Sequence, residues 1–216
     1  MSPLQEPSPN GVPPLFYQHY WSVVDQDVTT SVLSWLDSVT ILHPINRTFI
    51  TLIPKITNLE YVQEYWHISL CNVLYKIFSK VLANRLKKIL PSIITEYQYA
   101  FFKDRLISDN THVAFETLHC MKKDKIGETG FMAVKLNMSK AYDRVKWGYL
   151  ENLMRKMNFN ERWIGLVIVC VGIVTYLILI NGEPQGMIHP IRGIRQGDPL
   201  SPFLFLLCME GLHGLI

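Results

Sequence analysis

Apolar residues recur at steps of three and four between Leu70 and Leu90, which is the clearest periodic pattern in the chain. That spacing places them on one face of a helix, while the cationic side chains lie mostly off the apolar stripe. These cations are Lys76, Lys80, Arg85, Lys87 and Lys88. We predict an amphipathic helix that Pro91 ends, with a basic outer face that is either a solvated surface or a contact for phosphates.

The N-terminal part predicts a further helix. An aromatic and β-branched stretch runs from Phe16 to Leu36, and we expect Phe16, Tyr20, Val24 and Leu36 to be buried. Residues 1–14 are polar and rich in proline, which favours an extended lead-in. They hold no basic segment followed by an apolar one, so a secretory signal is not expected, and the chain is predicted to stay inside the cell, in the nucleus or the cytoplasm.

Strand and helix patterns mix in the second half. Residues 131–136 form an apolar run that predicts a short buried strand, and this places Asn137 between the strand and the next helix. Ser139 is a suitable N-terminal cap for that helix. Its apolar face would consist of Trp147, Leu150, Met154 and Met157.

Residues 163–180 carry no charge, and their length is near the lower limit for a membrane-spanning helix. Two glycines and several β-branched residues interrupt the run, and Asn181-Gly182 after it is a strong hairpin-turn signal. We predict a buried helix followed by a buried strand, with a membrane helix as the alternative. A second strand is expected around Met187, and an apolar helix over residues 203–212.

The order of these elements, helical first and mixed afterwards, favours an α+β fold over a doubly wound parallel sheet. A chain of 216 residues with 49% apolar residues has enough material for one medium-sized domain. Its net charge of +3 is too small to identify a nucleic-acid partner by itself. The four cysteines lie far apart and are expected to be reduced thiols, neither zinc ligands nor a disulfide framework.

The loop at residues 193–202, Gly-Ile-Arg-Gln-Gly-Asp-Pro-Leu-Ser-Pro, is the stretch most suggestive of chemistry. Two glycines and two prolines make a tight loop that exposes backbone directly before a helix N-terminus, a place suited to holding a base or a phosphate. A purely structural turn is the alternative. Two further unusual stretches occupy residues 134–145 and 100–110.

In their order along the chain, these three stretches resemble successive motifs of the reverse transcriptase of non-LTR (LINE-type) retrotransposons, especially plant-type elements. The resemblance covers nearly the whole chain, because residues 7–11 are similar to a degraded entry motif and residues 68–90 to the first fingers helix. It implies a right-hand polymerase in which residues 1–130 are fingers and residues 131–216 an incomplete palm, with the thumb absent. An RNA template and a DNA primer are the implied partners.

Polymerases of that family join a primer 3′-hydroxyl to an incoming nucleotide with two Mg²⁺ ions, which stabilise the attacking and the leaving oxygen. Protein carboxylates hold such ions. The family has one aspartate where this chain has Asn137, and two more in an aromatic-Ala-Asp-Asp hairpin that the resemblance places beyond Ile216. We therefore expect no intact metal site, and we expect the nearby Asp143 to serve structure.

Other positions carry over one by one. Tyr142 matches the aromatic residue that packs under the sugar of the incoming nucleotide, and Arg105 matches a fingers arginine near the triphosphate. Gln196 and Gly197 match the loop that lines the template-nucleotide pocket. The expected contacts to nucleic acid are Lys76, Lys80, Lys87, Lys88 and Arg195. At Trp66-His67 the family has Arg-Pro, so one cationic group is lost.

Taken together, the motif order and the substituted positions predict a partial RNA-directed DNA polymerase domain from a degenerate retroelement, catalytically inert as it stands. The hydrophobic pattern survives where the motif residues do not. A non-catalytic RNA-binding remnant that reuses the same elements would show the same pattern, and it remains the alternative.

Overall fold

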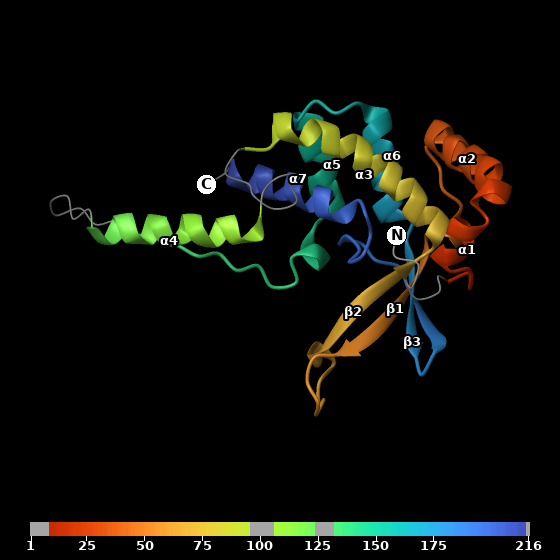
Figure 1. Cartoon of the computed structure of the whole chain (residues 1–216), viewed down its shortest axis with the longest axis horizontal. Coiled ribbons are helices and arrows are strands. Elements are labelled where there is room, and N and C mark those ends of the chain that lie inside the picture. Colours follow the sequence, from red (N-terminus) through yellow and green to blue (C-terminus); the bar gives the residue numbers. More distant parts are fainter. Residues whose placement is uncertain (1–8, 96–105, 124–131, 215–216) are drawn as a thin grey trace.

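The structure is a computed structural model that describes residues 9–95, 106–123 and 132–214. The described residues form a mixed α+β fold with one small sheet, which confirms the predicted α+β class (Figure 1). The helices are α1 (Pro14–His19), α2 (Trp21–Ser38), α3 (Val73–Ile93), α4 (Ile107–Lys123), α5 (Trp147–Lys156), α6 (Glu161–Gly172) and α7 (Ser201–His213). The strands are β1 (Arg47–Pro54), β2 (Tyr65–Cys71), β3 (Thr175–Ile180) and β4 (Glu183–Ile188). Short 3₁₀ turns are η1 (His43–Asn46), η2 (Val62–Glu64) and η3 (Tyr142–Arg144).

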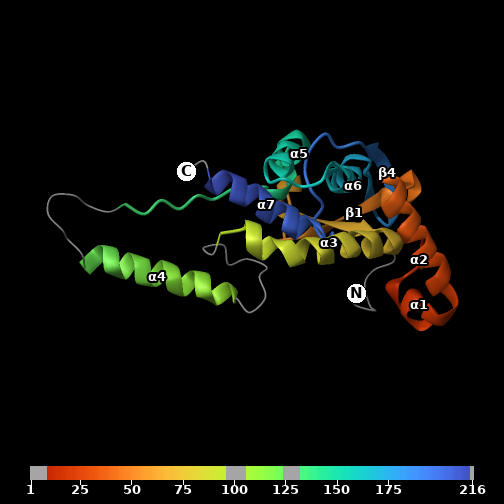
Figure 2. The same ribbon diagram turned by 90° about the horizontal axis from the view of Figure 1, so that it is seen from above.

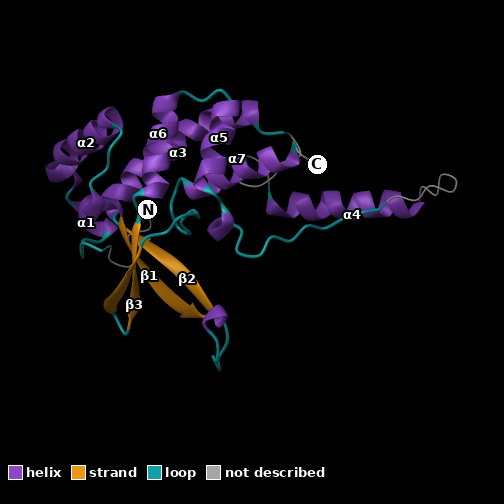
Figure 3. Ribbon diagram, turned by 180° about the vertical axis from the view of Figure 1, so that it is seen from behind, coloured by secondary structure: helices purple, strands orange, loops and turns teal. Residues whose placement is uncertain are grey.

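The four strands lie in the order β2-β1-β3-β4, and the sheet extends away from the helical part of the molecule (Figures 1 and 3). β1 pairs antiparallel with β2 and parallel with β3, and β3 pairs antiparallel with β4. Asn181 and Gly182 connect the last two strands, both with positive φ (52° and 84°), as a tight two-residue hairpin requires. The predicted hairpin is therefore confirmed.

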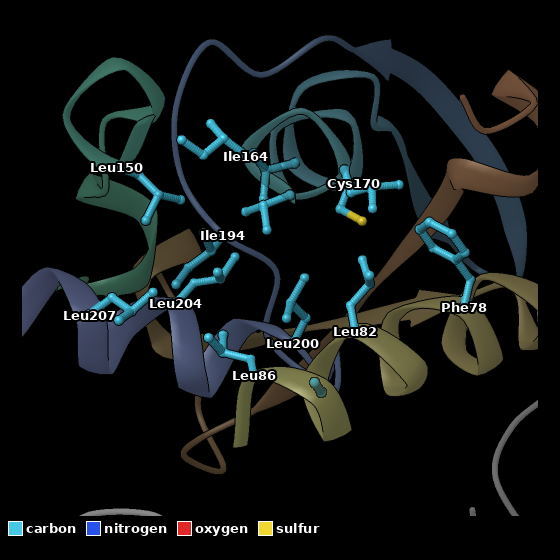
Figure 4. Packing of buried hydrophobic residues seen from close by; sticks show 14 of the residues in the cluster. Phe78, Leu82, Leu86, Leu150, Ile164, Cys170, Ile194, Leu200, Leu204 and Leu207 are labelled. Atoms are coloured by element: carbon cyan, nitrogen blue, oxygen red, sulfur yellow. The ribbon is translucent and has the colours of Figure 1, made fainter. Parts of the chain in front are cut away.

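The hydrophobic core lies where α3, α5, α6 and α7 meet (Figures 2 and 4). Side chains from all four helices interdigitate there, and each is almost fully removed from solvent. They include Phe78, Leu82, Leu86, Leu150, Ile164, Cys170, Leu204 and Leu207. α2 joins this core through Trp35, whose ring meets that of Phe78 edge to face at 6.1 Å. Ile194 and Leu200 of the loop at residues 193–200 belong to the same core, as does Cys71 at the end of β2.

The basic amphipathic helix is present, with different ends from those predicted. Leu70 and Cys71 belong to β2, so α3 begins only at Val73, where the Asn72 side chain caps it by accepting the Leu74 N–H at 2.9 Å. Pro91 does not end the helix, which continues to Ile93. A proline this close to the C-terminus removes a single backbone hydrogen bond, and one further turn is tolerated.

The strand predicted at residues 131–136 is wrong for the described part, residues 132–136, which pair with no other strand. Met132, Val134 and Leu136 are exposed by 83%, 66% and 68%. A strand is stable only beside a neighbour, and no strand of the described residues pairs with this segment. Ser139 lies in a turn and caps no helix, because the following helix α5 begins at Trp147.

The first predicted helix divides into α1 and α2 at Tyr20. Leu36 is buried as expected and Val24 packs against the core, whereas Phe16 and Tyr20 are exposed by 40% and 48%, so their predicted burial is wrong. The uncharged run at residues 163–180 forms helix α6 followed by strand β3, as predicted, but β3 is mostly half-buried and Ile180 at its end is exposed. No helix in the described ranges is long and apolar enough to cross a membrane.

Candidate nucleotide and template site

A hollow of about 430 Å³ opens between α3, η3 and the loop that precedes α7. Its lining consists of Lys76, Lys80, Tyr142, Gln196, Gly197, Asp198, Pro199 and Pro202. Five of the residues predicted from the sequence therefore line one cavity, although they come from three segments far apart in the chain. We call it the loop cavity.

α3 contributes the cationic wall of the loop cavity. Lys76 and Lys80 are one helical turn apart, so both face the same side of α3. Lys76 is buried at 8% exposure, and Lys80 is exposed. An exposed ammonium beside a cavity is available to a phosphate, whereas Lys76 lines the cavity as a buried residue.

Arg195 connects the loop at residues 193–202 to the rest of the molecule through buried polar contacts. Its guanidinium donates hydrogen bonds to the side chains of Asn46 (2.6 Å) and Thr48 (3.1 Å) and to the carbonyl of Cys170 (2.8 Å). It also forms an ion pair with Asp198 at 3.3 Å. Its side chain is only 2% exposed, so this group faces inward and is not presented to a nucleic acid, contrary to the sequence-based expectation.

Both carboxylate oxygens of Asp198 also accept hydrogen bonds from protein groups. One carboxylate oxygen accepts the hydroxyl of Tyr75 at 2.5 Å, and the other accepts the N–H of Leu200 at 2.9 Å. The Arg195 guanidinium lies 3.8 Å from the centre of the Tyr75 ring, which adds a cation–π contact. Burial raises the pKa of Tyr75 well above its ordinary value, so this phenol remains a neutral donor.

The loop is also tied to the segment that carries Tyr142. The N–H groups of Gly193 and Ile194 donate to the carbonyls of Val145 (2.7 Å) and Tyr142 (3.0 Å). Gly193 has φ +94°, and a Cβ there would lie 3.3 Å from the Asp143 backbone. Only glycine suits both the backbone conformation and the close approach, which is how the loop brings Gln196 and Tyr142 to one cavity.

The Tyr142 ring is half-buried and packs on Phe205 of α7, with ring centres 5.1 Å apart. Burial raises the pKa of its hydroxyl, so it is neutral at physiological pH. Its contact with Phe205 fixes the Tyr142 ring as a flat wall of the loop cavity. A fixed aromatic wall can select among sugars and bases by shape without forming an ion pair.

A second, smaller hollow of about 110 Å³ lies on the other side of Gln196, which lines both. Here His67 Nε2 lies 3.6 Å from Asp143 Oδ1 and links β2 to η3. Tyr176 also lines it, and burial raises the pKa of this tyrosine to about 12. The sequence did not predict the contact between His67 and Asp143, because 76 positions separate them and no local pattern joins them.

The remaining predicted site residues do not line the loop cavity. Lys87 and Lys88 are exposed farther along α3, and Asn137 is exposed on the unpaired segment before η3. Arg105 lies outside the described residues. Within the described part of the chain, the site therefore unites Tyr142, Gln196 and Gly197 with the first two lysines of α3.

Among the described residues near the loop cavity, the donors do not fit a pair of Mg²⁺ ions. Among the residues that the structure describes, no three His, Cys, Asp or Glu side chains are close enough together to hold a metal ion. Asn137 offers an amide without charge, Asp198 is occupied by Tyr75, Leu200 and Arg195, and Asp143 faces His67. Two neighbouring dications need several negative ligands, and these positions supply too few.

The chain is similar in sequence to several known proteins. Over 206 residues, 95% of this chain, it is 26% identical to the transposon TX1 uncharacterized 149 kDa protein of Xenopus laevis, of which it covers 16%. It is 25% identical over 163 residues, 75% of this chain, to a Pol polyprotein from the type-1 retrotransposable element R2 of Popillia japonica, of which it covers 22%. Over 39 residues, 18% of this chain, it is 67% identical to an uncharacterized mitochondrial protein of Arabidopsis thaliana, of which these residues cover 32%.

The first two relatives are proteins of non-LTR retrotransposons, and the chain spans less than a quarter of the length of either. Residues 53–216, about three quarters of the chain, match the family described as reverse transcriptase (RNA-dependent DNA polymerase). The match includes the loop cavity and every element that lines it. This chain therefore belongs to the reverse transcriptase family.

Proposed function

We propose that the chain supplies the fingers, residues 1–130, and part of the palm, residues 131–216, of the reverse transcriptase of a non-LTR retroelement. The observation that carries this proposal is the loop cavity, where Tyr142, Gln196, Gly197 and Lys80 converge from separate segments. The short stretch that is 67% identical to a plant protein supports a plant-type element as the source.

Each side chain of the loop cavity has a role in this proposal. Tyr142, held flat by Phe205, packs under the sugar of a nucleotide, and Gln196 and Gly197 border the template base. Lys80 neutralises a phosphate at the rim, and the exposed Lys87 and Lys88 continue this contact along the strand. In this proposal Arg195 makes no contact with nucleic acid and instead holds Gln196 and Gly197 in place. Arg105 is assigned to the triphosphate from the resemblance alone.

We further propose that residues 1–216 are catalytically inert. Asn137 replaces the first metal-binding aspartate, and no aromatic-Ala-Asp-Asp sequence occurs between residues 1 and 216. Mg²⁺ in an intact member of the family lowers the barrier to phosphoryl transfer by stabilising the attacking and leaving oxygens. Here the donors near the loop cavity are already engaged with protein groups, so no productive pair of ions is expected.

Primer extension on an RNA template, with Mg²⁺ or Mn²⁺, tests the inertness. Neither the 216-residue chain nor its Asn137→Asp variant should incorporate nucleotides, because restoring one carboxylate does not restore the pair of ions. Template-dependent incorporation by the 216-residue chain itself would overturn the inertness. Incorporation by the Asn137→Asp variant alone would show that Asn137 is correctly assigned and that the other carboxylates are supplied from within the chain.

Binding without catalysis is a second candidate, favoured by the row of exposed lysines on α3. A single-stranded RNA should then bind with an affinity that falls as salt rises, because each neutralised phosphate releases counterions, with a slope of roughly 0.7 per contact. Replacing Lys80, Lys87 and Lys88 by Gln should reduce the slope by about two. The matched control replaces Lys122, Lys123 and Lys156, which lie on other helices, and should leave the slope unchanged. Equal effects of both triple variants would contradict a specific basic face.

A further inference from the structure

A third hollow lies next to the loop cavity, between the segment at residues 138–146 and the helices α5 and α7. Its volume is about 300 Å³, at the lower limit for small-molecule sites in proteins. Six apolar side chains form most of its wall. They are Met138, Ala141, Val145, Phe205, Met209 and Leu212. We call it the apolar hollow. It shares no lining residue with the loop cavity, so the function proposed above leaves it without a role.

Packing fixes the shape of the apolar hollow. Phe205 forms one wall, and its ring packs on the ring of Tyr142, with centres 5.1 Å apart. α5 and α7 lie side by side (Figures 1 and 2), and at Gly211 they approach so closely that a Cβ would lie 2.6 Å from the Tyr149 hydroxyl. That hydroxyl donates to the carbonyl of Cys208 at 3.3 Å. The walls are therefore in place before a ligand arrives, while flexible methionine side chains can adapt to it.

Two cations and no carboxylate line the apolar hollow. Arg144 and Lys146 are both exposed, so they belong to its opening. Among the described residues, neither forms an ion pair. The acidic residues of the flanking elements are Asp143, Glu151 and Glu210, and each contacts another protein group instead. An anion at this opening therefore meets positive charge that no neighbouring carboxylate neutralises.

The other polar groups of the wall are few. Tyr149 and Cys208 supply a hydroxyl and a thiol. Burial raises the pKa of both, that of Cys208 to about 12, so both are neutral and repel no anion. A nucleobase carries several donors and acceptors, and this wall would leave most of them without a partner, at a cost in free energy. The hollow therefore suits a hydrocarbon body and not a base.

We propose that the apolar hollow binds a monocarboxylic acid with a hydrocarbon chain. The chain lies against the apolar wall, where each buried methylene strengthens binding about fourfold. The carboxylate lies at the opening beside Arg144 and Lys146, and a guanidinium can donate to both of its oxygens. The proposal is independent of the loop cavity, because no residue lines both sites.

Isothermal titration calorimetry of residues 1–216 with decanoate, below the concentration at which decanoate forms micelles, tests the proposal. One molecule should bind per chain. Octanoate, which is two methylenes shorter, should bind about fifteenfold more weakly. Decanol, which lacks the charge, should bind about fivefold more weakly, because two exposed ion pairs are lost. Decylammonium, which carries the opposite charge, should bind more weakly than decanol.

Variants locate the bound acid. Arg144→Gln with Lys146→Gln should weaken decanoate binding about fivefold. The matched control, Lys122→Gln with Lys123→Gln, removes two exposed cations of α4 and should bind as the parent does. Leu212→Glu places a carboxylate in the wall and should weaken binding more than Leu212→Gln, which adds a polar group of the same size without charge. Leu212 is half-buried and lies outside the hydrophobic core, so both variants should fold, which circular dichroism verifies.

Several outcomes would overturn the proposal. The absence of any heat of binding with decanoate is the simplest. Equal binding of decanoate, decanol and decylammonium would show adsorption to apolar surface without a role for the two cations. Equal weakening by the α4 control pair would show only general attraction of opposite charges, and equal binding by the two Leu212 variants and the parent would place the acid elsewhere. Binding to vesicles of anionic phospholipid, with none to decanoate, would make this region a membrane contact.

Discussion

Arg195 forms more buried polar contacts than any other side chain described above, so its replacement should lower the stability of the fold. Arg195→Met leaves the Asp198 carboxylate buried without its cation and removes the donors to Asn46 and Thr48. Removing one partner of a buried pair typically costs about 3–5 kcal/mol. Urea denaturation should show a loss of that size for Arg195→Met and less than about 0.5 kcal/mol for Arg192→Met, whose side chain is exposed.

An Arg195→Lys variant separates charge from geometry. Lysine keeps the positive charge but cannot donate in several directions from one plane, so it should recover only part of the lost stability. If Arg195→Met costs as little as Arg192→Met, the buried network does not hold the loop. In that case the positions of Gln196 and Gly197 depend on the backbone hydrogen bonds to Tyr142 and Val145 alone.

The four cysteines should divide three to one in their reactivity toward thiol reagents. Cys71, Cys170 and Cys208 are buried, and burial raises the pKa of Cys170 and of Cys208 to about 12, so few thiolates form there at pH 8. Cys120 on α4 is exposed. In the native protein one thiol should react rapidly, and after unfolding all four should react. Cys120→Ser should abolish the rapid phase of the native protein. Two rapid thiols in the native protein would contradict this packing.

Part of the site could be predicted from residues alone. The sequence indicated Tyr142, Gln196 and Gly197 because their motifs are local, and the structure brings them together with Lys76 and Lys80. It could not indicate that Arg195 faces inward, because the acceptors Asn46 and Thr48 lie about 150 positions earlier in the chain. A cation in an exposed-looking loop has the same local pattern whether it binds phosphate or a buried carbonyl.

At the scale of elements, the β3–β4 hairpin offers a direct test of turn chemistry. Gly182 has φ +84°, so a Gly182→Ala variant forces a side chain into the left-handed region and should lose about 1 kcal/mol of stability. Gly148 lies in helix α5 with open space where a Cβ would be, so Gly148→Ala should be neutral or stabilise by about 0.5 kcal/mol. Thermal unfolding compares the two. A loss for Gly148→Ala as large as that for Gly182→Ala would show that the turn is not specifically strained.

Elements were predictable where a periodic pattern or a turn signal was strong. The basic helix, the α6–β3 unit and the Asn181-Gly182 turn all have such signals, and all three formed. β1 and β2 were not predicted, because their partners determine them: β1 lies between β2 and β3, and the parallel contact joins Arg47 to Thr175. Residues 132–136 show the converse, because a sequence that resembles a strand remains unpaired where no neighbour is present.

At the scale of the whole molecule, the α+β class followed from the order of elements, whereas their arrangement depended on long-range contacts. The buried side chains gather among α3, α5, α6 and α7, and the sheet extends away from these helices (Figure 1). α4 extends away from this core in both perpendicular views, with Phe115 and Leu118 exposed by 74% and 55% (Figures 1 and 2). Burial is therefore concentrated in one part of the chain, and the remainder contributes little to stability.

This uneven burial makes self-association the expected failure of the isolated chain. Met132, Val134 and Leu136 are exposed at alternate positions of an extended, unpaired segment, which is the pattern that recruits a second strand. An apolar hollow of about 300 Å³, lined by Val145, Phe205 and neighbours, lies beside Met138 at the end of that segment. The average particle mass measured by light scattering should therefore increase with the concentration of residues 1–216, and the unfolding transition should be broad and low in temperature.

A double substitution separates this cause from general instability. Val134→Lys with Leu136→Lys places two charges on exposed positions, so it should suppress association. The free energy of unfolding in urea should change by less than about 0.5 kcal/mol. The matched control, Phe115→Lys with Leu118→Lys, changes exposed apolar residues of α4 and should leave association unchanged if the unpaired segment is responsible. Suppression by the α4 pair alone would assign association to that helix. A sharp transition at an ordinary mesophilic temperature, with a particle mass that does not increase with concentration, would show that the core suffices and that the exposed strand pattern carries no cost.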